Sequence, residues 1–256
     1  MTISIVNHKG GTGKTTTTIN LGSALALNGH RVLLVDFDAQ GSLSYSLGIG
    51  DELPTITDLL HGDESIGTVL QERELMHVLP ANTSLADIEF AIAKSEDRFH
   101  HLKNLLSLAG DYDFVLIDCP PSLSLLTLNA LTASEYVIVP MQMDVLALRG
   151  LDSMIETIQK VNGINPGLKL LGVLPIMVDV RKNIHQEILR HIQTSYRGVR
   201  LFKQAIHTSV KAAEAPSFGK SVVSYAPSST TAADYKELAL EVAKLCKVNN
   251  KQVAVQ

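Results

Sequence analysis

A short segment rich in glycine, lysine and threonine, NHKGGTGKTTTT (Asn7–Thr18), carries the residue types that bind phosphate groups. It follows a strand-like apolar run and opens a helical pattern, so it is predicted to be the loop between them. Glycines permit a tight turn whose backbone N–H groups point at an anion, and the following helix adds its positive dipole end. The loop glycines are Gly10, Gly11 and Gly13; Lys14 is placed to reach the outer phosphates and Thr15 to coordinate Mg²⁺.

Three acidic residues follow strand-like runs elsewhere in the chain. Asp36 and Asp38 end the run VLLVDFD, and Asp118 ends FVLID. In parallel α/β sheets, ligands bind at the carboxyl ends of the strands. Phosphoryl transfer requires chiefly positioning and charge neutralisation, which carboxylates with Mg²⁺ supply. The glycine-rich loop and the three acids together predict a site for a nucleoside triphosphate.

The elements that must position these groups alternate along the chain. Strand-like runs such as VLLVD and FVLID are apolar at nearly every position, which is typical of strands buried on both faces of a parallel sheet. The predicted fold is therefore α/β, a doubly wound, mostly parallel sheet with helices on both faces. We expect one domain over residues 1–247 and a frayed tail over 248–256. The expected strands cover 3–7, 32–36, 76–80, 114–118, 136–140 and 170–177, and the main helices 14–27, 85–93, 99–108, 123–133, 146–161, 185–193 and 231–246.

The composition of the chain excludes several classes of protein. With 45% hydrophobic and 19% charged residues among 256, the chain has enough apolar material for a large core, which excludes a disordered or fibrous protein. No apolar run reaches the roughly 18 to 20 residues of a membrane-spanning helix, and the N-terminus lacks a signal-peptide pattern. Two cysteines, Cys119 and Cys246, form neither a disulfide framework nor a CxxC metal site. We expect a soluble protein of the reducing cytoplasm.

The net charge of −4 conceals a basic segment. Residues 181–220 contain eight Lys and Arg residues but only two Glu. Such a local excess attracts polyanions even in a mildly acidic protein, and nucleic acid is one such partner. The alternative is a solvated surface on which these residues are scattered.

The phosphate segment departs from the common pattern G-x-x-x-x-G-K-[ST], whose first glycine would fall on His8. It reads K-G-G-x-G-K-[ST]-[ST], with an additional lysine, Lys9, five residues before Lys14. In this it resembles the deviant Walker A box of the ParA/MinD family of P-loop ATPases, and in particular the ParA/Soj-type partition ATPases. Further ParA-like segments are PMQMDVLALRGL (Pro140–Leu151), LGVLPIMVDVR (Leu171–Arg181) and EAPSFGK (Glu214–Lys220).

The chain also differs from the ParA pattern at several positions. Asp144 replaces the usual Glu of the first of these segments. Where the family commonly has P-R-N-V-R-L-S before E-A-P-S, this chain has H-T-S-V-K-A-A, so Thr208 and Lys211 stand where arginines are expected.

The resemblance implies roles for the matching residues. Lys9 would reach across a dimer interface to the partner's nucleotide, Asp38 would orient the attacking water, and Asp118 would support Mg²⁺ through water. Asp36 would help to order the metal's ligands. The implied catalytic residues are Lys9, Lys14 and Asp38; the implied nucleotide contacts are Lys9, Gly10, Gly11, Thr12, Gly13, Lys14, Thr15, Thr16, Met177 and Pro216; and the implied metal residues are Thr15, Asp36 and Asp118.

The resemblance also implies a working cycle. ATP and Mg²⁺ would drive formation of a homodimer that binds DNA without sequence preference, and a ParB-like activator would stimulate a weak ATPase activity and release the DNA. The protein would segregate or position plasmid or chromosome DNA, or another large cargo, and would be associated with the nucleoid. The residues expected to bind DNA are Arg181, Lys182, Arg200, Lys203 and Lys211.

Two other functions remain open. A MinD-like membrane-associated ATPase would need an amphipathic C-terminal helix, but the apolar stripe of the last helix is expected to pack on the sheet and NNKQVAVQ lacks bulky apolar and basic faces. A metabolic ATP-dependent enzyme, such as an amidoligase, would need a second group of substrate-binding residues, and the sequence offers no clear one. Iron–sulfur carriers with a similar loop require cysteines that this chain lacks.

Overall fold

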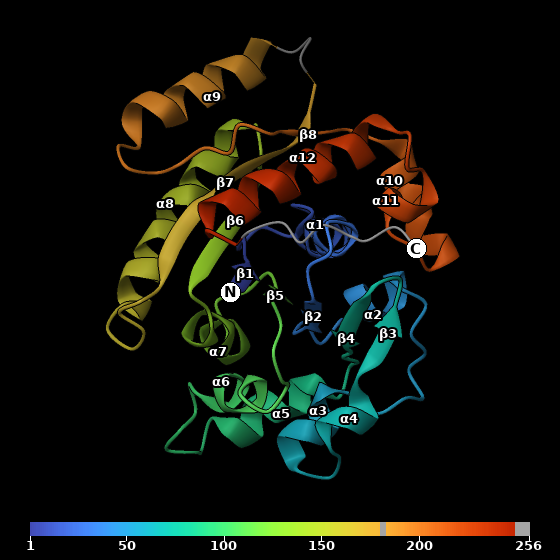
Figure 1. The fold of residues 1–256 in the computed structure, drawn as a ribbon. Coiled ribbons are helices and arrows are strands. Elements are labelled where there is room, and N and C mark those ends of the chain that lie inside the picture. The colour runs from blue at the N-terminus through green and yellow to red at the C-terminus, as the bar shows by residue number, and fades with distance from the viewer. Residues whose placement is uncertain (180–182, 249–256) are drawn as a thin grey trace.

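The computed structural model describes residues 1–179 and 183–248. Within them, eight strands form one sheet in the order β3-β4-β2-β5-β1-β6-β7-β8 (Figure 1). Neighbouring strands run parallel, except that β3 and β4 form an antiparallel hairpin. The strands are β1 (Thr2–Ile5), β2 (Val32–Asp36), β3 (Gln71–Arg73), β4 (Met76–Leu79), β5 (Phe114–Asp118), β6 (Tyr136–Gln142), β7 (Lys169–Val178) and β8 (Ile206–His207).

The central strands are buried on both faces, which explains their nearly continuous apolar sequences. In β2, Leu33 and Val35 pack into one hydrophobic core, whereas Val32 and Leu34 pack into a second core on the opposite face. Alternate side chains of a strand point to opposite faces, so a sheet covered on both sides needs apolar residues at every position.

Helices cover both faces of the sheet (Figure 1). The first core receives side chains from α3 (Ile56–His61), α4 (Ile66–Val69), α5 (Leu85–Ile92), α6 (His101–Leu106), α7 (Leu125–Ala133), α8 (Val145–Val161) and α9 (Asn183–Ser195). The second core receives them from α1 (Lys14–Leu27), α2 (Ser42–Ser46), α10 (Val210–Glu214), the 3-10 helix η1 (Ala215–Phe218), α11 (Val222–Tyr225) and α12 (Thr230–Leu245). The predicted doubly wound fold is confirmed.

The apolar stripe of α12 packs inward, as the sequence predicts. Tyr235, Leu238 and Val242 are at most 1% exposed and belong to the second core, which α12 shares with α1. This stripe is therefore occupied by the protein's own core. Among the described residues, no helix is long and apolar enough to span a bilayer.

Candidate functional site

The loop between β1 and α1 has the backbone of an anion cradle. Gly11 and Gly13 have φ values of 71° and 63°, in the left-handed region that favours glycine. Gly13 is the N-cap of α1 and provides no side-chain cap, so the first N–H groups of the helix are not capped by a side chain. This arrangement directs backbone donors and the positive end of the helix dipole at the same space.

Neighbouring elements hold this loop in place. The Asn7 side chain accepts a hydrogen bond from the Lys9 N–H at 2.9 Å and donates one to the Pro140 carbonyl, at the end of β6, at 2.7 Å. Gln142 donates from Nε2 to the Gly11 carbonyl at 3.2 Å. The loop is therefore anchored to β6 at two points before any ligand binds.

Lys14, at the start of α1, is a largely buried cation. Its side chain is 7% exposed, and Nζ lies 3.5 Å from the Lys9 carbonyl oxygen. Burial lowers the pKa of Lys14, while the nearby Asp118 carboxylate opposes that shift. A phosphate in the cradle would compensate this buried charge.

Lys9 has a different environment from Lys14. Its Nζ forms an ion pair with Asp144 Oδ2 at 2.9 Å, and both side chains are about two-fifths exposed (43% and 40%). Burial acts to raise the pKa of Asp144, but the hydrogen bond and charge of Lys9, together with hydrogen bonds from the Ala147 and Leu146 backbone, hold the pKa below its usual value. Asp144 also caps α8, because its Oδ1 accepts the Ala147 N–H at 2.8 Å. This ion pair could not be predicted from the sequence, because the two residues are 135 positions apart.

Asp36 and Asp118 lie at paired positions at the carboxyl ends of the adjacent strands β2 and β5. Both are fully buried. Asp118 Oδ2 accepts a hydrogen bond from the Thr15 hydroxyl at 2.6 Å, whereas its Oδ1 is buried with no hydrogen-bond partner among the described residues. Burial raises the pKa of Asp118 well above its usual value, and the Asp36 charge raises it further.

Asp36 is held by residues that the sequence analysis did not identify. Its Oδ2 accepts both the N–H and the hydroxyl of Ser44, at 2.9 and 2.7 Å. Burial raises the pKa of Asp36 to about 7, although these hydrogen bonds act in the opposite direction. Ser44 lies in α2, so the helix that follows the acidic loop is tied directly to this carboxylate.

The donor set of Thr15, Asp36 and Asp118 fits Mg²⁺. The unpartnered Oδ1 of Asp118 and the Thr15 hydroxyl present oxygen ligands at one point, and a bound cation would offset the cost of two buried carboxylates. The described residues contain no group of three or more His, Cys, Asp or Glu side chains able to hold a metal. Mg²⁺ commonly binds through one or two carboxylates, substrate phosphates and water. Two carboxylates and one hydroxyl, from Asp36, Asp118 and Thr15, are consistent with such a site.

Asp38 lies just beyond Asp36 on the loop after β2 and is half-buried. Its Oδ1 accepts the Gln40 N–H at 3.0 Å, and its own N–H lies 3.4 Å from Asp36 Oδ1. Asp36 at the end of β2 is thus fully buried, and Asp38 on the loop that follows is partly accessible, which suits a metal role for Asp36 and a water-orienting role for Asp38.

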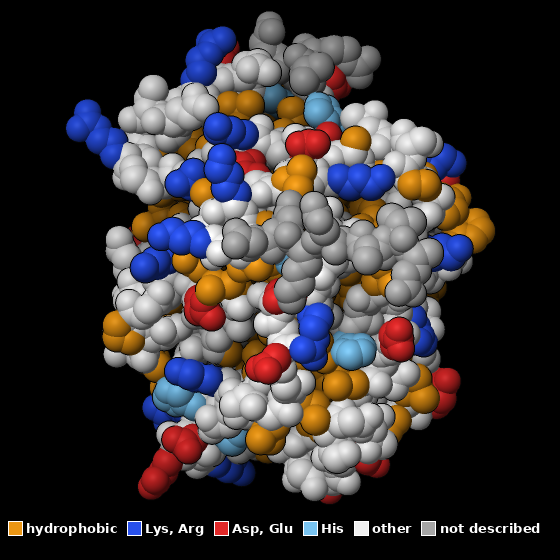
Figure 2. All heavy atoms as spheres, viewed as in Figure 1, with side chains coloured by type: hydrophobic (Ala, Val, Ile, Leu, Met, Phe, Trp, Pro, Cys, Tyr) orange, Lys and Arg blue, Asp and Glu red, His pale blue; other side chains and the backbone are white. Residues whose placement is uncertain are grey.

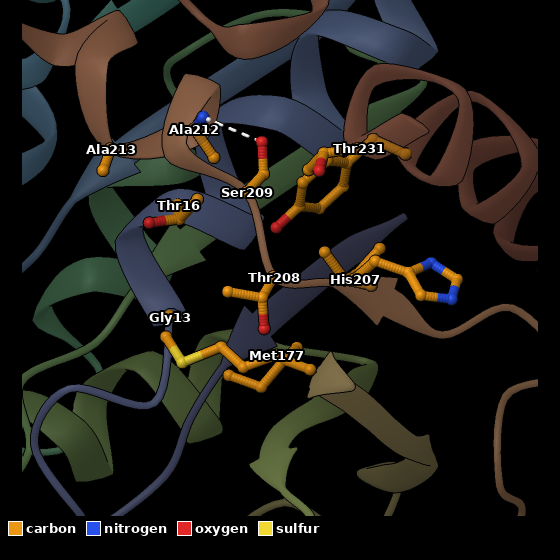
Figure 3. A pocket seen from close by; sticks show the side chains of 12 residues that line it. Gly13, Thr16, Met177, His207, Thr208, Ser209, Ala212, Ala213 and Thr231 are labelled. Atoms are coloured by element: carbon orange, nitrogen blue, oxygen red, sulfur yellow. Dashed lines mark hydrogen bonds between the residues drawn. The ribbon is translucent and has the colours of Figure 1, made fainter. Parts of the chain in front are cut away.

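A cavity of about 190 Å³ adjoins the cradle (Figure 3). Gly13 and Thr16 form its wall on the loop side, and Met177 and Thr208, from the ends of β7 and β8, lie next to each other on another side. Its mostly apolar lining and its position suit a nucleotide base. Met177, which the resemblance implies as a nucleotide contact, lines this cavity.

Pro216 does not line that cavity. It lines a smaller one, of about 20 Å³, together with Thr15 and Thr16. η1 packs against α2, α10 and α11, and residues of η1 and of the start of α1 both line this smaller cavity.

Arg200 and Lys203 line a surface cavity of about 560 Å³ with two lysines that the sequence analysis did not single out, Lys244 and Lys247 at the end of α12. On the face shown in Figure 2, many of the Lys and Arg side chains lie in the upper half of the molecule. Glu241 lies in the same cavity and accepts the Lys203 N–H.

The other expected DNA contacts are not part of that group. Lys211 lies on α10, where its Nζ pairs with Glu214 Oε2 at 2.8 Å, and it does not line the cavity of Arg200 and Lys203. Arg181 and Lys182 lie outside the described residues.

Comparisons with known proteins identify the family of the chain. The family model described as "AAA domain" matches residues 1–170. The chain is 41% identical over 245 residues to the chromosome-partitioning ATPase Soj of Treponema pallidum (strain Nichols), covering 94% of this chain and 96% of that protein. It is 40% identical over 248 residues to the chromosome partitioning protein ParA of Caulobacter vibrioides (strain NA1000 / CB15N), covering 94% and 92%.

A solved structure matches over the whole chain. It is cobyrinic acid a,c-diamide synthase from Mycobacterium smegmatis with bound ADP and magnesium. The sequence identity is 36%, the TM-score is 0.84, and the match covers 100% of this chain and 99% of that one.

Proposed function

The chain belongs to the Soj/ParA family of chromosome-partitioning ATPases, and from that membership we propose that it is a Mg²⁺-dependent ATPase that works as a dimerising, DNA-binding switch. The observation that carries the proposal is the pair of lysines in the glycine-rich loop. Lys14 is buried at the helix start, whereas the Lys9 side chain is exposed and, among the described residues, forms a surface ion pair with Asp144.

Hydrolysis of ATP in this site depends on positioning. The loop N–H groups and Lys14 bind the β- and γ-phosphates, and Asp38 orients a water molecule for attack on the γ-phosphorus. The P–O bond to ADP breaks as the new P–O bond to water forms, and the products are ADP and inorganic phosphate. Thr15, Asp36 and Asp118 would hold Mg²⁺, which when bound would neutralise the charge that develops on the phosphates.

The exposure of Lys9 supports the proposal that the protein dimerises with ATP. In the isolated chain its ammonium is paired with Asp144 at the surface. A partner's triphosphate carries more negative charge than one carboxylate, so Lys9 exchanges Asp144 for the phosphates of the partner subunit. The γ-phosphate thereby selects the dimer, and hydrolysis releases it.

We assign DNA binding to the basic surface. The cavity lined by Arg200 and Lys203 has more basic than acidic residues, since Lys244 and Lys247 accompany them and Glu237 and Glu241 oppose them. Contacts between such basic side chains and phosphate groups bind DNA without sequence preference. Arg181, Lys182 and Lys211 remain proposed contacts. A ParB-like activator protein is proposed to stimulate hydrolysis and so end the DNA-bound state.

A ligase activity is the second candidate, because the matched structure with 36% identity is a cobyrinic acid a,c-diamide synthase. Both thiols of this chain are buried, and burial raises the pKa of Cys246 to about 11 and that of Cys119 further. Neither thiol is therefore available to release ammonia from glutamine. ATP turnover that requires a carboxylic acid and ammonia, and is indifferent to DNA, would favour the ligase.

A mobility-shift assay on DNA of random sequence tests the proposal. The protein is incubated without nucleotide, with ADP, with ATP and with a slowly hydrolysed ATP analogue, each with Mg²⁺. We expect a shift only with ATP and the analogue. No shift in any condition, or binding to anionic liposomes instead, would contradict the DNA-binding part of the proposal.

A further inference from the structure

The turn between β3 and β4 contacts two segments that border the nucleotide site. Two adjacent residues, Arg73 and Glu74, make these contacts through their side chains. The hairpin is an edge of the sheet and contains none of the residues assigned to the site above. Its side chains nevertheless contact the end of α2 and the residue Ser221, and both of these segments border the site.

Glu74 binds the end of the segment that packs beside the phosphate loop. Its Oε1 accepts the Ser221 N–H at 2.9 Å, and its Oε2 accepts the hydroxyls of Ser221 and Ser23 at 2.9 and 2.7 Å. Ser23 belongs to α1, and Ser221 caps α11. The carboxylate thus joins the helix of the phosphate loop to the C-terminal end of the segment 210–220.

A second contact reinforces this junction. Asn20 of α1 accepts the Val222 N–H at 2.7 Å, and its own amide donates to the Thr16 carbonyl at 2.7 Å. Segment 210–220 contributes to both cavities beside the loop: Ala212 lines both of them, and Pro216 lines the smaller one. Displacement of Ser221 would therefore move a wall of the proposed base site.

Arg73 binds the other segment, the end of α2. Its Nε donates to the Leu47 carbonyl at 3.1 Å, and its Nη2 donates to the Gly48 carbonyl at 3.4 Å. α2 follows the loop of Asp36 and Asp38, and Ser44 within it holds Asp36.

The two segments also touch each other directly. A Cβ added at Gly219, which follows η1, would lie 3.4 Å from the Gly48 Cα, and both glycines have positive φ values, 64° and 67°. The backbones of Gly48 and Gly219 are therefore so close that a side chain at either position would not fit easily. The Arg73–Glu74 turn contacts the chain on both sides of this close approach, through Arg73 to Leu47 and Gly48 and through Glu74 to Ser221.

The backbone of Glu74 supports a specific role for its side chain. Its φ is 54°, a conformation that glycine and asparagine adopt far more readily than glutamate. Strained residues persist where the surrounding contacts hold them, and here three hydrogen bonds do so.

We propose that the Arg73–Glu74 turn is a clamp that holds the segment 210–220, which lines the proposed base site, against the end of α2, so that both residues act as positioning residues for the nucleoside part of the ligand. The inference rests on the nucleotide site proposed above. The clamp does not touch the phosphate cradle, so it affects binding of the base and ribose and leaves binding of the phosphates unchanged.

Glu74→Asn tests the clamp, because asparagine tolerates the positive φ but is one methylene too short to reach Ser221 and Ser23. Titration calorimetry would measure the binding of Mg-ADP and of Mg-pyrophosphate, up to millimolar concentrations, to the full chain. We expect ADP affinity to fall about tenfold and pyrophosphate affinity to change less than about twofold. Glu74→Gln, which keeps an acceptor for the Ser221 N–H, should restore part of the ADP affinity.

Glu72→Gln on the exposed side of the same hairpin is the matched control and should bind both ligands as the wild type does. Unchanged ADP affinity in Glu74→Asn, or an equal loss for ADP and pyrophosphate, would overturn the clamp. Failure of the wild-type protein to bind either ligand would instead overturn the nucleotide site itself.

Discussion

At the scale of single residues, the site is dominated by charges that the protein buries before any ligand arrives. Lys14, Asp36 and Asp118 are each at most 7% exposed. Burying an ionised group costs free energy unless a partner of opposite charge compensates it. The site is therefore expected to be less stable when empty than when it holds Mg²⁺ and phosphate.

Asp36 gives this expectation a measurable pH dependence. Burial raises the pKa of Asp36 to about 7 from 3.8, so between these values the folded protein binds more protons than the unfolded chain. The contribution of Asp36 to stability is fully present below pH 4 and is lost as the pH rises through 7. Asp36→Asn cannot ionise, so without Mg²⁺ it should melt a few degrees above wild type at pH 8.

The increase in melting temperature of Asp36→Asn over wild type should vanish at pH 4. Scanning calorimetry at pH 4 and pH 8 would measure both differences. The same variant should bind Mg-ATP more weakly, because a metal-site carboxylate is gone. An equal melting shift at both pH values would show that the variant changes packing and not charge.

At the scale of elements, the phosphate loop owes its geometry to strand β6 as much as to its own glycines. Asn7 and Gln142 fasten the loop to that strand, and Asp144, just beyond it, holds Lys9 and caps α8. The ion pair keeps Lys9 on its own subunit, so it competes with the proposed reach of Lys9 to the partner.

Asp144→Asn isolates this competition, since asparagine still caps the helix but cannot form the ion pair. We expect the ATP-bound dimer to become about two- to fivefold tighter, the modest gain that release of an exposed ion pair allows. Sedimentation equilibrium with the slowly hydrolysed ATP analogue would measure the dimer dissociation constant. A tighter monomer–dimer equilibrium without nucleotide as well would mean that the residue acts through repulsion between subunits and not through Lys9.

The elements that the sequence predicted well are those with local signals at both ends. Helix α1 spans Lys14–Leu27 and strands β2 and β5 have the expected bounds, because glycines, buried apolar runs and terminal aspartates define them locally. Strands β3 and β8 and the run from α10 to α11 were missed, since they are short and exist through tertiary contacts such as that of Glu74 with Ser221.

The same distinction applies to the site. The grouping of Thr15 with Asp118 was predictable because the loop and the strand end belong to one sheet edge. The bond of Ser44 to Asp36, the ion pair of Lys9 with Asp144 and the separate cavity of Pro216 were not, because each depends on how distant segments pack.

At the scale of the whole molecule, the charge distribution separates the two proposed interfaces. The lysines of the loop lie at the carboxyl edge of the sheet, whereas Arg200 and Lys203 lie beside the C-terminal end of α12. A protein of net charge −4 can therefore bind a polyanion through the basic surface around Arg200 and Lys203. It can bind a second subunit through the separate surface around the phosphate loop.

The double substitution of Arg200 and Lys203 by alanine tests this arrangement. Each lost phosphate contact should make the slope of log K against log salt less steep by about 0.9, so the double variant should lose roughly two units, while ATP binding stays unchanged. Lys103→Ala, on α6 at the other face of the sheet, is the control. A wild-type slope in the double variant would place the DNA-binding surface elsewhere.

In the proposed dimer, ATP is held between two copies of the chain, and each copy contributes Lys9 to the nucleotide of the other. Sedimentation velocity in Mg-ATP would compare Asp38→Ala, which is expected to bind but not hydrolyse ATP, with the double variant Lys9→Ala/Asp38→Ala. We expect a stable dimer for Asp38→Ala and a monomer with bound ATP for the double variant. If both variants were dimers, or both were monomers, Lys9 would not hold the two subunits together through ATP.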